Sequence, residues 1–146
     1  MIGTAWQLEE LKNEPTRHIL CKRGLIDIRQ ENGIYWLGAS VENNIGNWDY
    51  EQLASPEDVD AIDVANTQSW KKMVWAWISK EHGVIRARTF AYRIGMPEVQ
   101  GNGSGSMNLA FQLKRHITIN HGDGSIIFAR PTSDNSAEVG GRVAAV

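Results

Sequence analysis

The chain has 146 residues, of which 42% are hydrophobic and 22% are charged, and its formal net charge is −2. This composition is that of an ordinary globular domain, so it excludes a disordered or fibrous protein. The small net charge gives no electrostatic reason to expect a nucleic acid or an anionic membrane as partner. Because no apolar run reaches spanning length and the first residues lack a signal-peptide pattern, we expect a cytoplasmic protein without membrane segments.

The first third of the chain predicts one helix followed by three short strands. Apolar side chains recur at helical spacing over residues 3–11, and Pro15 follows them. Segment 17–42 is rich in apolar strand formers. It is interrupted at Arg23-Gly24 and again at Asn32-Gly33, a dipeptide typical of a two-residue hairpin turn.

The counts of cysteine and tryptophan restrict the chemistry that we expect. Cys21 is the one cysteine, so the chain forms no internal disulfide. Its apolar neighbours favour a buried strand thiol over a reactive one. Three of the six tryptophans, Trp70, Trp75 and Trp77, lie in a strand pattern, which favours core or sheet-face positions over a ligand cage.

The middle of the chain predicts a short capped helix and a strand pair. Ser55 and Pro56 are typical N-cap and first-turn residues of a helix over 56–63. Strands are expected at 71–79 and 84–92, joined by a Lys-Glu-His-Gly turn.

The second of these strands places two arginines on one face. Arg86 and Arg88 alternate with small or apolar residues, so both side chains point the same way. Two interpretations stay open. The commoner one is a solvated basic face, and the other is a clamp for a substrate carboxylate.

The last part of the chain predicts a buried helix and three strands. Apolar side chains cover most of the circumference of the helix expected at 104–114, so we expect it to lie in the middle of the fold. The strands are expected in the segments HITIN, SIIFAR and AEVGGRVAAV.

Residues 3–29 and 103–130 repeat one order of elements: a helix, an Arg-His-Ile strand, a glycine-containing turn and an isoleucine-rich strand that ends in arginine. A strand pair precedes the second copy, whereas the first copy begins with its helix. We therefore expect an incomplete first lobe at 1–54 and a more complete second lobe at 55–146. A homodimer is expected to cover the helix and the sheet edge that the missing strands would leave open.

The order of several motifs resembles the phenazine-biosynthesis isomerase-like (PhzF-like) family, and the resemblance covers nearly the whole chain. The segments that carry it are GTAW at 3–6, YEQLASPED at 50–58, an arginine strand, a glycine-rich loop before a helix, an Arg-Pro pair and a closing Val-Gly-Gly strand. The matched residues in the second half are Arg88, Phe90, Ala91, Gly95, Glu98, Gly103, Ser104, Gly122, Arg130, Pro131, Val139, Gly140 and Gly141.

The resemblance implies an α+β fold of the diaminopimelate epimerase type. In that fold a mixed, largely antiparallel sheet wraps around a central buried helix in each of two pseudo-repeats, the first of which is incomplete here. It also implies cofactor-free proton transfer on a small carboxylate-bearing metabolite, in a cleft that the helix N-termini face. Such chemistry needs a general acid or base and hydrogen-bond donors for the anionic end of the substrate.

The chain departs from the family pattern at two places. The leading segment that carries the usual catalytic glutamate has no counterpart, and Val99 and Asn102 stand where the family has aspartate and threonine. Valine cannot transfer a proton, so the two residues left as candidates for acid or base chemistry are Glu98 and His121. For Glu98 a structural role, bonded to loop amides, is the favoured alternative. For His121 the alternative is a solvated turn residue.

The glycine-rich loop predicts an anion-binding site. Its small residues let the backbone approach a ligand, and amides at a helix start suit a carboxylate or a phosphate. The expected site consists of Gly101, Asn102, Gly103, Ser104, Gly105 and Ser106. The alternative is a flexible loop in which a serine merely caps the helix.

Two functions therefore stay open. One is a small PhzF-like isomerase or epimerase that binds a carboxylate-bearing metabolite, with little catalytic machinery left. The other is a non-catalytic remnant of that family that acts as a dimeric binding or structural module. We expect no metal centre, because the histidines lie far apart in the sequence, and no cofactor.

Overall fold

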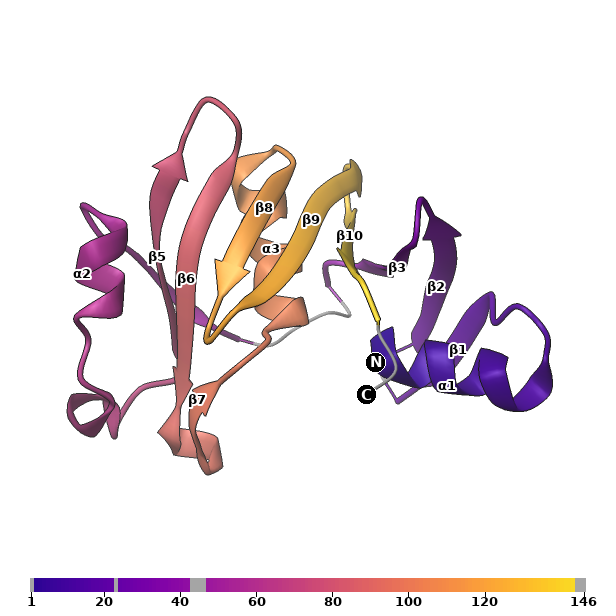
Figure 1. The fold of residues 1–146 in the computed structure, drawn as a ribbon, viewed down its shortest axis with the longest axis horizontal. Helices are drawn as coiled ribbons and strands as arrows, with labels where there is room; N and C mark the ends of the chain where they lie inside the picture. Colours follow the sequence, from indigo (N-terminus) through magenta and orange to yellow (C-terminus); the bar gives the residue numbers. More distant parts are fainter. Residues whose placement is uncertain (1, 23, 43–46, 144–146) are drawn as a thin grey trace.

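The computed structural model describes residues 2–22, 24–42 and 47–143, and for residues 2–6 it describes the backbone (Figure 1). The helices are α1 (Ile2–Lys12), α2 (Pro56–Asp60) and α3 (Gly103–Leu113), with the short 3-10 helices η1 (Val64–Thr67) and η2 (Tyr92–Ile94). The strands are β1 (His18–Cys21), β2 (Gly24–Glu31), β3 (Ile34–Ser40), β4 (Asp49–Gln52), β5 (Lys72–Ser79), β6 (Val84–Ala91), β7 (Met96–Val99), β8 (Ile117–His121), β9 (Ser125–Ser133) and β10 (Ser136–Gly141).

All ten strands belong to one mixed sheet that extends across the molecule (Figure 1). Their order is β1-β2-β3-β10-β9-β8-β6-β5-β4, and β7 pairs with the C-terminal end of β6. The pairs β4–β5 and β6–β8 are parallel, and the others are antiparallel. The prediction of an α+β fold with a mixed sheet is confirmed.

Helix α3 packs against β9 and β10 and supplies the centre of the main core. Its buried residues are Gly105, Ser106, Met107, Leu109 and Ala110, and Phe111 and Leu113 are partly buried. They meet apolar side chains from β2, β3, β5, β6, β8, β9 and β10. The predicted burial of this helix is therefore confirmed.

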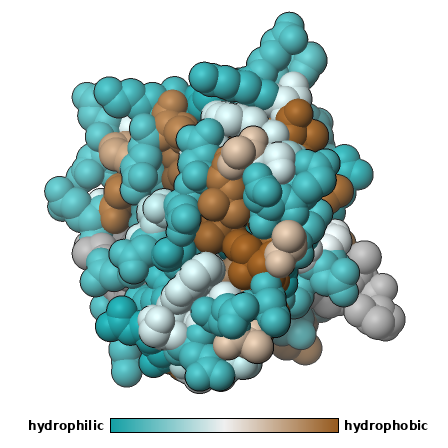
Figure 2. All heavy atoms as spheres, turned by 90° about the vertical axis from the view of Figure 1, so that its left-hand side faces the viewer, coloured by the Kyte–Doolittle hydropathy of each residue, from teal (hydrophilic) through white to brown (hydrophobic). Residues whose placement is uncertain are grey.

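Helix α2 covers the opposite face of β5 and β6 with a smaller core of Val59, Val74, Ala76 and Phe90. Ser55 caps α2 as predicted: its hydroxyl accepts from the Asp58 amide at 3.2 Å, and the Asp58 carboxylate accepts from the Ser55 amide at 3.1 Å. Figure 2 views the molecule from this side and shows a strip of hydrophobic atoms within a mainly hydrophilic surface. Half-buried Leu53, Ile62, Val64 and Trp70 pack here against the smaller core.

Two strands lie where the sequence predicts none. Strand β4 reads Asp-Tyr-Glu-Gln and forms only because it pairs with β5, whereas β7 contains Pro97, which cannot donate to a ladder. Both lie at the margin of the sheet, where proline and charged residues are tolerated. The other predicted strands and all three predicted helices are present, and the end of the last predicted strand, 144–146, lies outside the described residues.

The two segments that repeat in the sequence contain the same elements in the same order. Helix α1 is followed by β1, β2 and β3, and α3 is followed by β8, β9 and β10. The sets meet in the sheet, where β3 pairs with β10. The division into lobes at residue 54 stays a prediction: β4, at 49–52, pairs with β5 of the expected second lobe.

The indole of Trp36 lies so close to Gly140 of β10 that it leaves no room for a side chain there. A Cβ atom on Gly140 would lie 2.8 Å from Trp36 Cε3 and 2.9 Å from Ile34 Cγ2. The ring has little freedom to move, because it is 4% exposed and the Arg130 guanidinium lies 4.1 Å from its centroid. We expect Gly140→Ala to destabilise the fold by about 2 kcal/mol in urea denaturation.

Gly38 on the neighbouring strand is the matched control for this prediction. It lies on the same face of the sheet, but a Cβ atom there would come no closer than 3.8 Å to another atom. We expect Gly38→Ala to leave the free energy of unfolding almost unchanged. Equal losses in the two variants would show that steric overlap with Trp36 is not what restricts position 140.

Candidate functional site

Asn102 caps helix α3, and it does so from a buried position. Its Oδ1 accepts a hydrogen bond from the Gly105 amide at 2.8 Å, and its carbonyl accepts from the Ser106 hydroxyl at 2.6 Å. The residue is 4% exposed. The alternative in which a serine caps the helix is therefore wrong, since α3 begins at Gly103 with asparagine as its N-cap.

The six residues predicted to bind an anion differ in their access to solvent. Gly101 is exposed, Gly103 and Ser104 are half-buried, and Asn102, Gly105 and Ser106 are buried. The amides of Gly105 and Ser106 bond to Asn102. The Gly103 amide, at the first helical position, has no acceptor within the helix by geometry. The accessible residues of the loop are therefore Gly101, Gly103 and Ser104.

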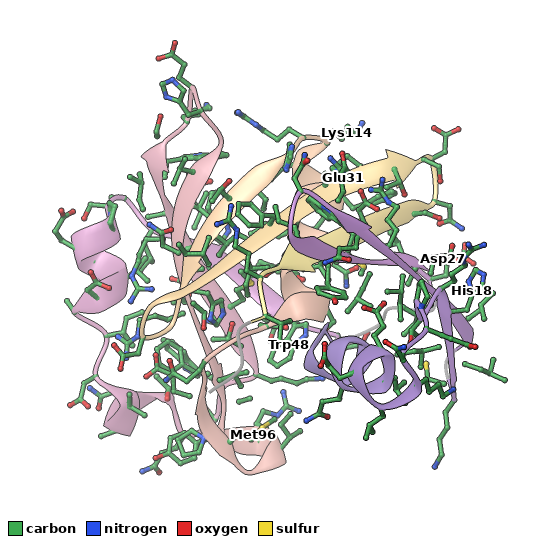
Figure 3. The ribbon with its side chains drawn as sticks, turned by 45° about the vertical axis from the view of Figure 1, so that its right-hand side comes forward. His18, Asp27, Glu31, Trp48, Met96 and Lys114 are labelled. Atoms are coloured by element: carbon green, nitrogen blue, oxygen red, sulfur yellow. The ribbon has the colours of Figure 1, made fainter. Side chains whose placement is uncertain are left out.

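Side chains from β4 and its surroundings border the start of α3. The Trp48 indole donates to the Ser104 hydroxyl at 3.1 Å, and the Tyr50 hydroxyl donates to the Gly105 carbonyl at 3.0 Å. Figure 3 shows Trp48 beside the end of α3. The Lys71 ammonium group lies 5.3 Å from the centroid of the Trp48 ring. Sequence reasoning missed these residues, because β4 itself was not predicted.

His121 is fully buried, so the expectation of a solvated turn residue is wrong. It is the last residue of β8, where Nδ1 lies 3.2 Å from the Gln100 carbonyl and Nε2 lies 2.9 Å from Thr89 Oγ1. A carbonyl can only accept, so Nδ1 carries the proton and Nε2 accepts from the threonine hydroxyl. Burial lowers the pKa of His121 to about 4, which keeps the ring neutral at pH 7.

A chain of hydrogen bonds joins His121 to the helix cap. The Asn102 side-chain amide donates to Thr89 Oγ1 at 3.3 Å, and that hydroxyl in turn donates to His121. Thr89 is fully buried. Both ring nitrogens of His121 therefore have partners, and the network fixes the amide of Asn102 in its capping orientation.

Glu98 forms a bidentate ion pair with Arg88 instead of binding loop amides. Arg88 Nε lies 2.8 Å from one carboxylate oxygen and Nη2 lies 2.9 Å from the other. The two side chains are 12% and 18% exposed. These hydrogen bonds lower the pKa of Glu98. The pair ties β7 to β6.

The two arginines of β6 do not form the solvated face that was the commoner expectation. Arg86 Nε donates to Asp60 at 2.7 Å, and its Nη1 donates to the Asn120 carbonyl at 3.0 Å. Its side chain is 18% exposed. Each arginine does hold a carboxylate, but the carboxylate belongs to the protein itself.

Three further observations concern the remaining candidates. Cys21 is half-buried, and its thiol lies 3.4 Å from the Gly24 carbonyl oxygen. Within residues 2–22, 24–42 and 47–143, no three histidine, cysteine or acidic side chains are grouped so that they could hold a metal ion. In the same part of the chain, no helix has both the length and the hydropathy to cross a membrane.

No protein-family model matches the sequence. Several solved structures share its fold, and for two of them the comparison covers 97% of this chain and 67% of the other. One is described as a phenazine biosynthesis PhzC/PhzF protein from Clostridium difficile strain 630, with a TM-score of 0.70 and 16% identity. The other is a phenazine biosynthesis protein of the PhzF family from Enterococcus faecalis, with a TM-score of 0.73 and 15% identity. The chain therefore has the fold of the PhzF family, as its ordered motifs predict.

Proposed function

We propose that this PhzF-fold protein binds a small carboxylate-bearing metabolite at the N-terminus of α3 and does not convert it. The observation that carries this proposal is the state of the two candidate catalytic residues. Glu98 is held by Arg88, and both ring nitrogens of His121 are bonded within the protein. What is left at the loop is an anion-attracting surface without a poised proton carrier.

The electrostatics at the start of α3 support the binding half of the proposal. The dipole of an 11-residue helix favours a negative charge at its N-terminus, where the Gly103 amide has no acceptor in the helix. Lys71 adds a positive charge on the Trp48 side of this end. A carboxylate at Gly101–Ser104 would accept from the Gly103 amide and lie near the Lys71 ammonium group.

The protonation states of Glu98 and His121 support the second part of the proposal, that the bound metabolite is not converted. A general base at neutral pH works best with a pKa near 7, and Arg88 shifts the pKa of Glu98 in the opposite direction. His121 has a pKa of about 4 and is fully buried, so it is a weak base that a substrate does not reach. Val99, which pairs with Thr89 of β6, has no proton to give.

The homodimer and the cytoplasmic location stay predictions. Strand β1 is at the margin of the sheet, and two leucines at this end are strongly exposed: Leu20 of β1 at 80% and Leu11 of α1 at 83%. A second copy that paired with β1 would cover both the open strand and these side chains.

An NMR titration with benzoate tests the binding proposal, with benzamide as the uncharged control. We expect benzoate to shift the amide signals of Gly101 and Gly103 and the indole signal of Trp48. Lys71→Gln should weaken binding about threefold, as expected for loss of one half-buried charge near the surface. Lys72→Gln is the matched control, since Lys72 pairs with Glu51 at 2.8 Å and lies over Trp70.

Benzamide binding as tightly as benzoate would contradict the proposed anion site. The absence of catalysis has its own readout, which is exchange of solvent deuterium into the carbon atoms of a panel of carboxylic acids. We expect no incorporation. Incorporation that Glu98→Gln abolishes would show that this carboxylate leaves Arg88 during a reaction and would restore the isomerase interpretation.

A further inference from the structure

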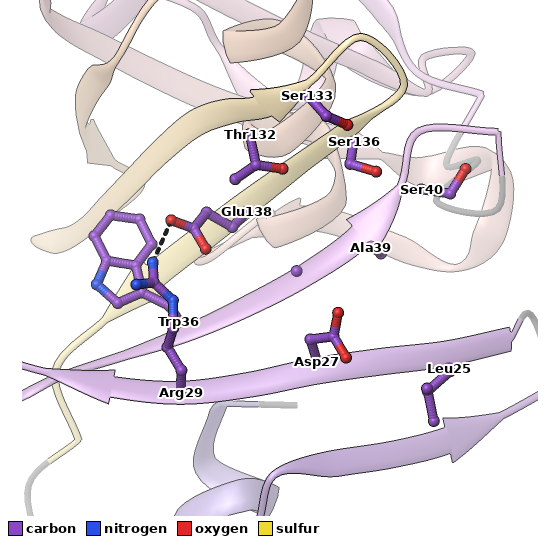
Figure 4. A pocket seen from close by; sticks show the side chains of 11 residues that line it. Leu25, Asp27, Arg29, Trp36, Ala39, Ser40, Thr132, Ser133, Ser136 and Glu138 are labelled. Carbon is purple, nitrogen blue, oxygen red and sulfur yellow. Dashed lines mark hydrogen bonds and ion pairs between the residues drawn. The ribbon is translucent and has the colours of Figure 1, made fainter.

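A pocket of about 390 Å³ opens on the face of the sheet opposite α3. It lies over β2, β3 and β10 and the end of β9 (Figure 4). Successive strand residues alternate between faces, and the residues next to Glu138 on β10, Ala137 and Val139, point into the main core. Glu138 therefore points away from α3, and none of the residues that line the pocket belongs to the glycine-rich loop.

Gly38 forms the floor of this pocket, with a carboxylate on each side. In the sheet it pairs with Asp27 of β2 and with Glu138 of β10. A Cβ atom on Gly38 would lie 3.8 Å from Asp27 Cβ and 3.9 Å from Glu138 Cβ. The missing side chain thus leaves a gap between the two acidic residues.

Glu138 is buried, but only one of its two oxygens is paired. The residue is 6% exposed, and its Oε1 accepts from Arg29 Nη2 at 2.6 Å and from Arg130 Nε. No hydrogen bond or ion pair joins Oε2 to any residue that the structure describes. Figure 4 shows this second oxygen directed into the pocket. This oxygen is therefore free to accept a hydrogen bond from a molecule that enters the pocket.

The charges around the gap favour a cation as ligand, because the carboxylates of Asp27, Glu31 and Glu138 outnumber the two guanidinium groups. Arg29 and Arg130 are both engaged with Glu138, and each also bonds Glu31, at 3.1 and 3.3 Å. Asp27 carries the second charge beside the gap, and its Oδ1 lies 3.0 Å from His18 Nδ1. Two carboxylates without a third ligating side chain suit an N–H donor better than a metal ion.

The other end of the pocket is built for a short polar chain. The hydroxyl groups of Ser40, Ser133, Ser136 and Thr132 line it, and Leu25 forms an apolar wall. We propose that this pocket binds a small organic amine that also carries a hydroxyl group. Its ammonium group lies over Gly38 between Asp27 and Glu138 Oε2, and its hydroxyl group lies among the serine and threonine side chains.

The test uses 2-aminoethanol as probe, with two controls that each lack one feature. Ethylene glycol has a hydroxyl group in place of the ammonium group, and tetramethylammonium has the charge but no N–H donor. We expect 2-aminoethanol to give saturable NMR shifts at the Gly38, Ser40 and Ser136 amides. Both controls should bind about tenfold more weakly, because the charged hydrogen bonds to Glu138 are lost.

Two variants locate the site. Gly38→Val should abolish binding by filling the gap, while Asp27→Asn, on an exposed side chain, should weaken it about threefold. The benzoate titration at α3 reports independently whether each variant is folded, and if Gly38→Val is not folded, Asp27→Asn decides. The proposal is overturned if 2-aminoethanol gives no saturable shift, if ethylene glycol binds equally well, or if neither folded variant weakens binding.

Discussion

Lowering the pH from 7 to 4 is expected to destabilise the fold by about 3 kcal/mol through His121 alone. Burial lowers the pKa of His121 to about 4, against an ordinary value of 6.5. Between these values the unfolded chain binds the proton and the folded chain does not. Stability contributed by the neutral ring is therefore complete above pH 6.5 and falls as the pH drops to 4. Urea denaturation at pH 7, 5.5 and 4.5 measures the slope.

His121→Gln separates this effect from general acid denaturation. An amide, like the neutral imidazole, has one donor end and one acceptor end for the Gln100 carbonyl and the Thr89 hydroxyl, but it takes up no proton. The variant should lose most of the slope between pH 6.5 and 4.5. Glu98 acts in the same direction only at lower pH, because Arg88 lowers its pKa. An unchanged slope in the variant would show that His121 is not the group that titrates.

The elements that could be predicted from the sequence are those with local signals. The Asn32-Gly33 turn has both residues at positive φ, at 53° and 74°, and the Ser55 capping box forms as the residue types require. Strands β4 and β7 have no such signal. They form because β5 and β6 offer backbone groups with which they can pair, and a residue-by-residue pattern does not reveal this pairing.

In the candidate site, too, features with a local sequence signal could be predicted, and features that depend on strand pairing could not. The start of α3 could be predicted from the sequence. Asparagine is a preferred N-cap residue, so the residue type of Asn102 is a local signal for the cap that the structure shows. The burial of His121 could not be predicted, because it depends on β8 pairing with β6 beside the α3 loop. Nor could the partner of Arg88, since Glu98 reaches it only once β7 has formed.

Arg88→Met is expected to cost about 3 kcal/mol, because it leaves the carboxylate of Glu98 half-buried without its cation. It also removes the donor that Nη1 provides to three carbonyl groups, those of Val59, Asp60 and Ile62. Hydrogen exchange should show β7 as the first strand to lose protection, since this ion pair links it to β6.

Arg86→Met is the matched control for the loss at position 88. It removes a guanidinium group from the same strand and face, but its carboxylate partner, Asp60, is 56% exposed and regains water. We expect a loss of about 1 kcal/mol. Replacing both members, in Arg88→Met with Glu98→Leu, should recover part of the larger loss, because no buried charge then stays unpaired. Equal losses for the two arginine variants would mean that the Glu98 carboxylate gains little from Arg88. That carboxylate would then be free to carry a proton, and the case against catalysis at this loop would fail with it.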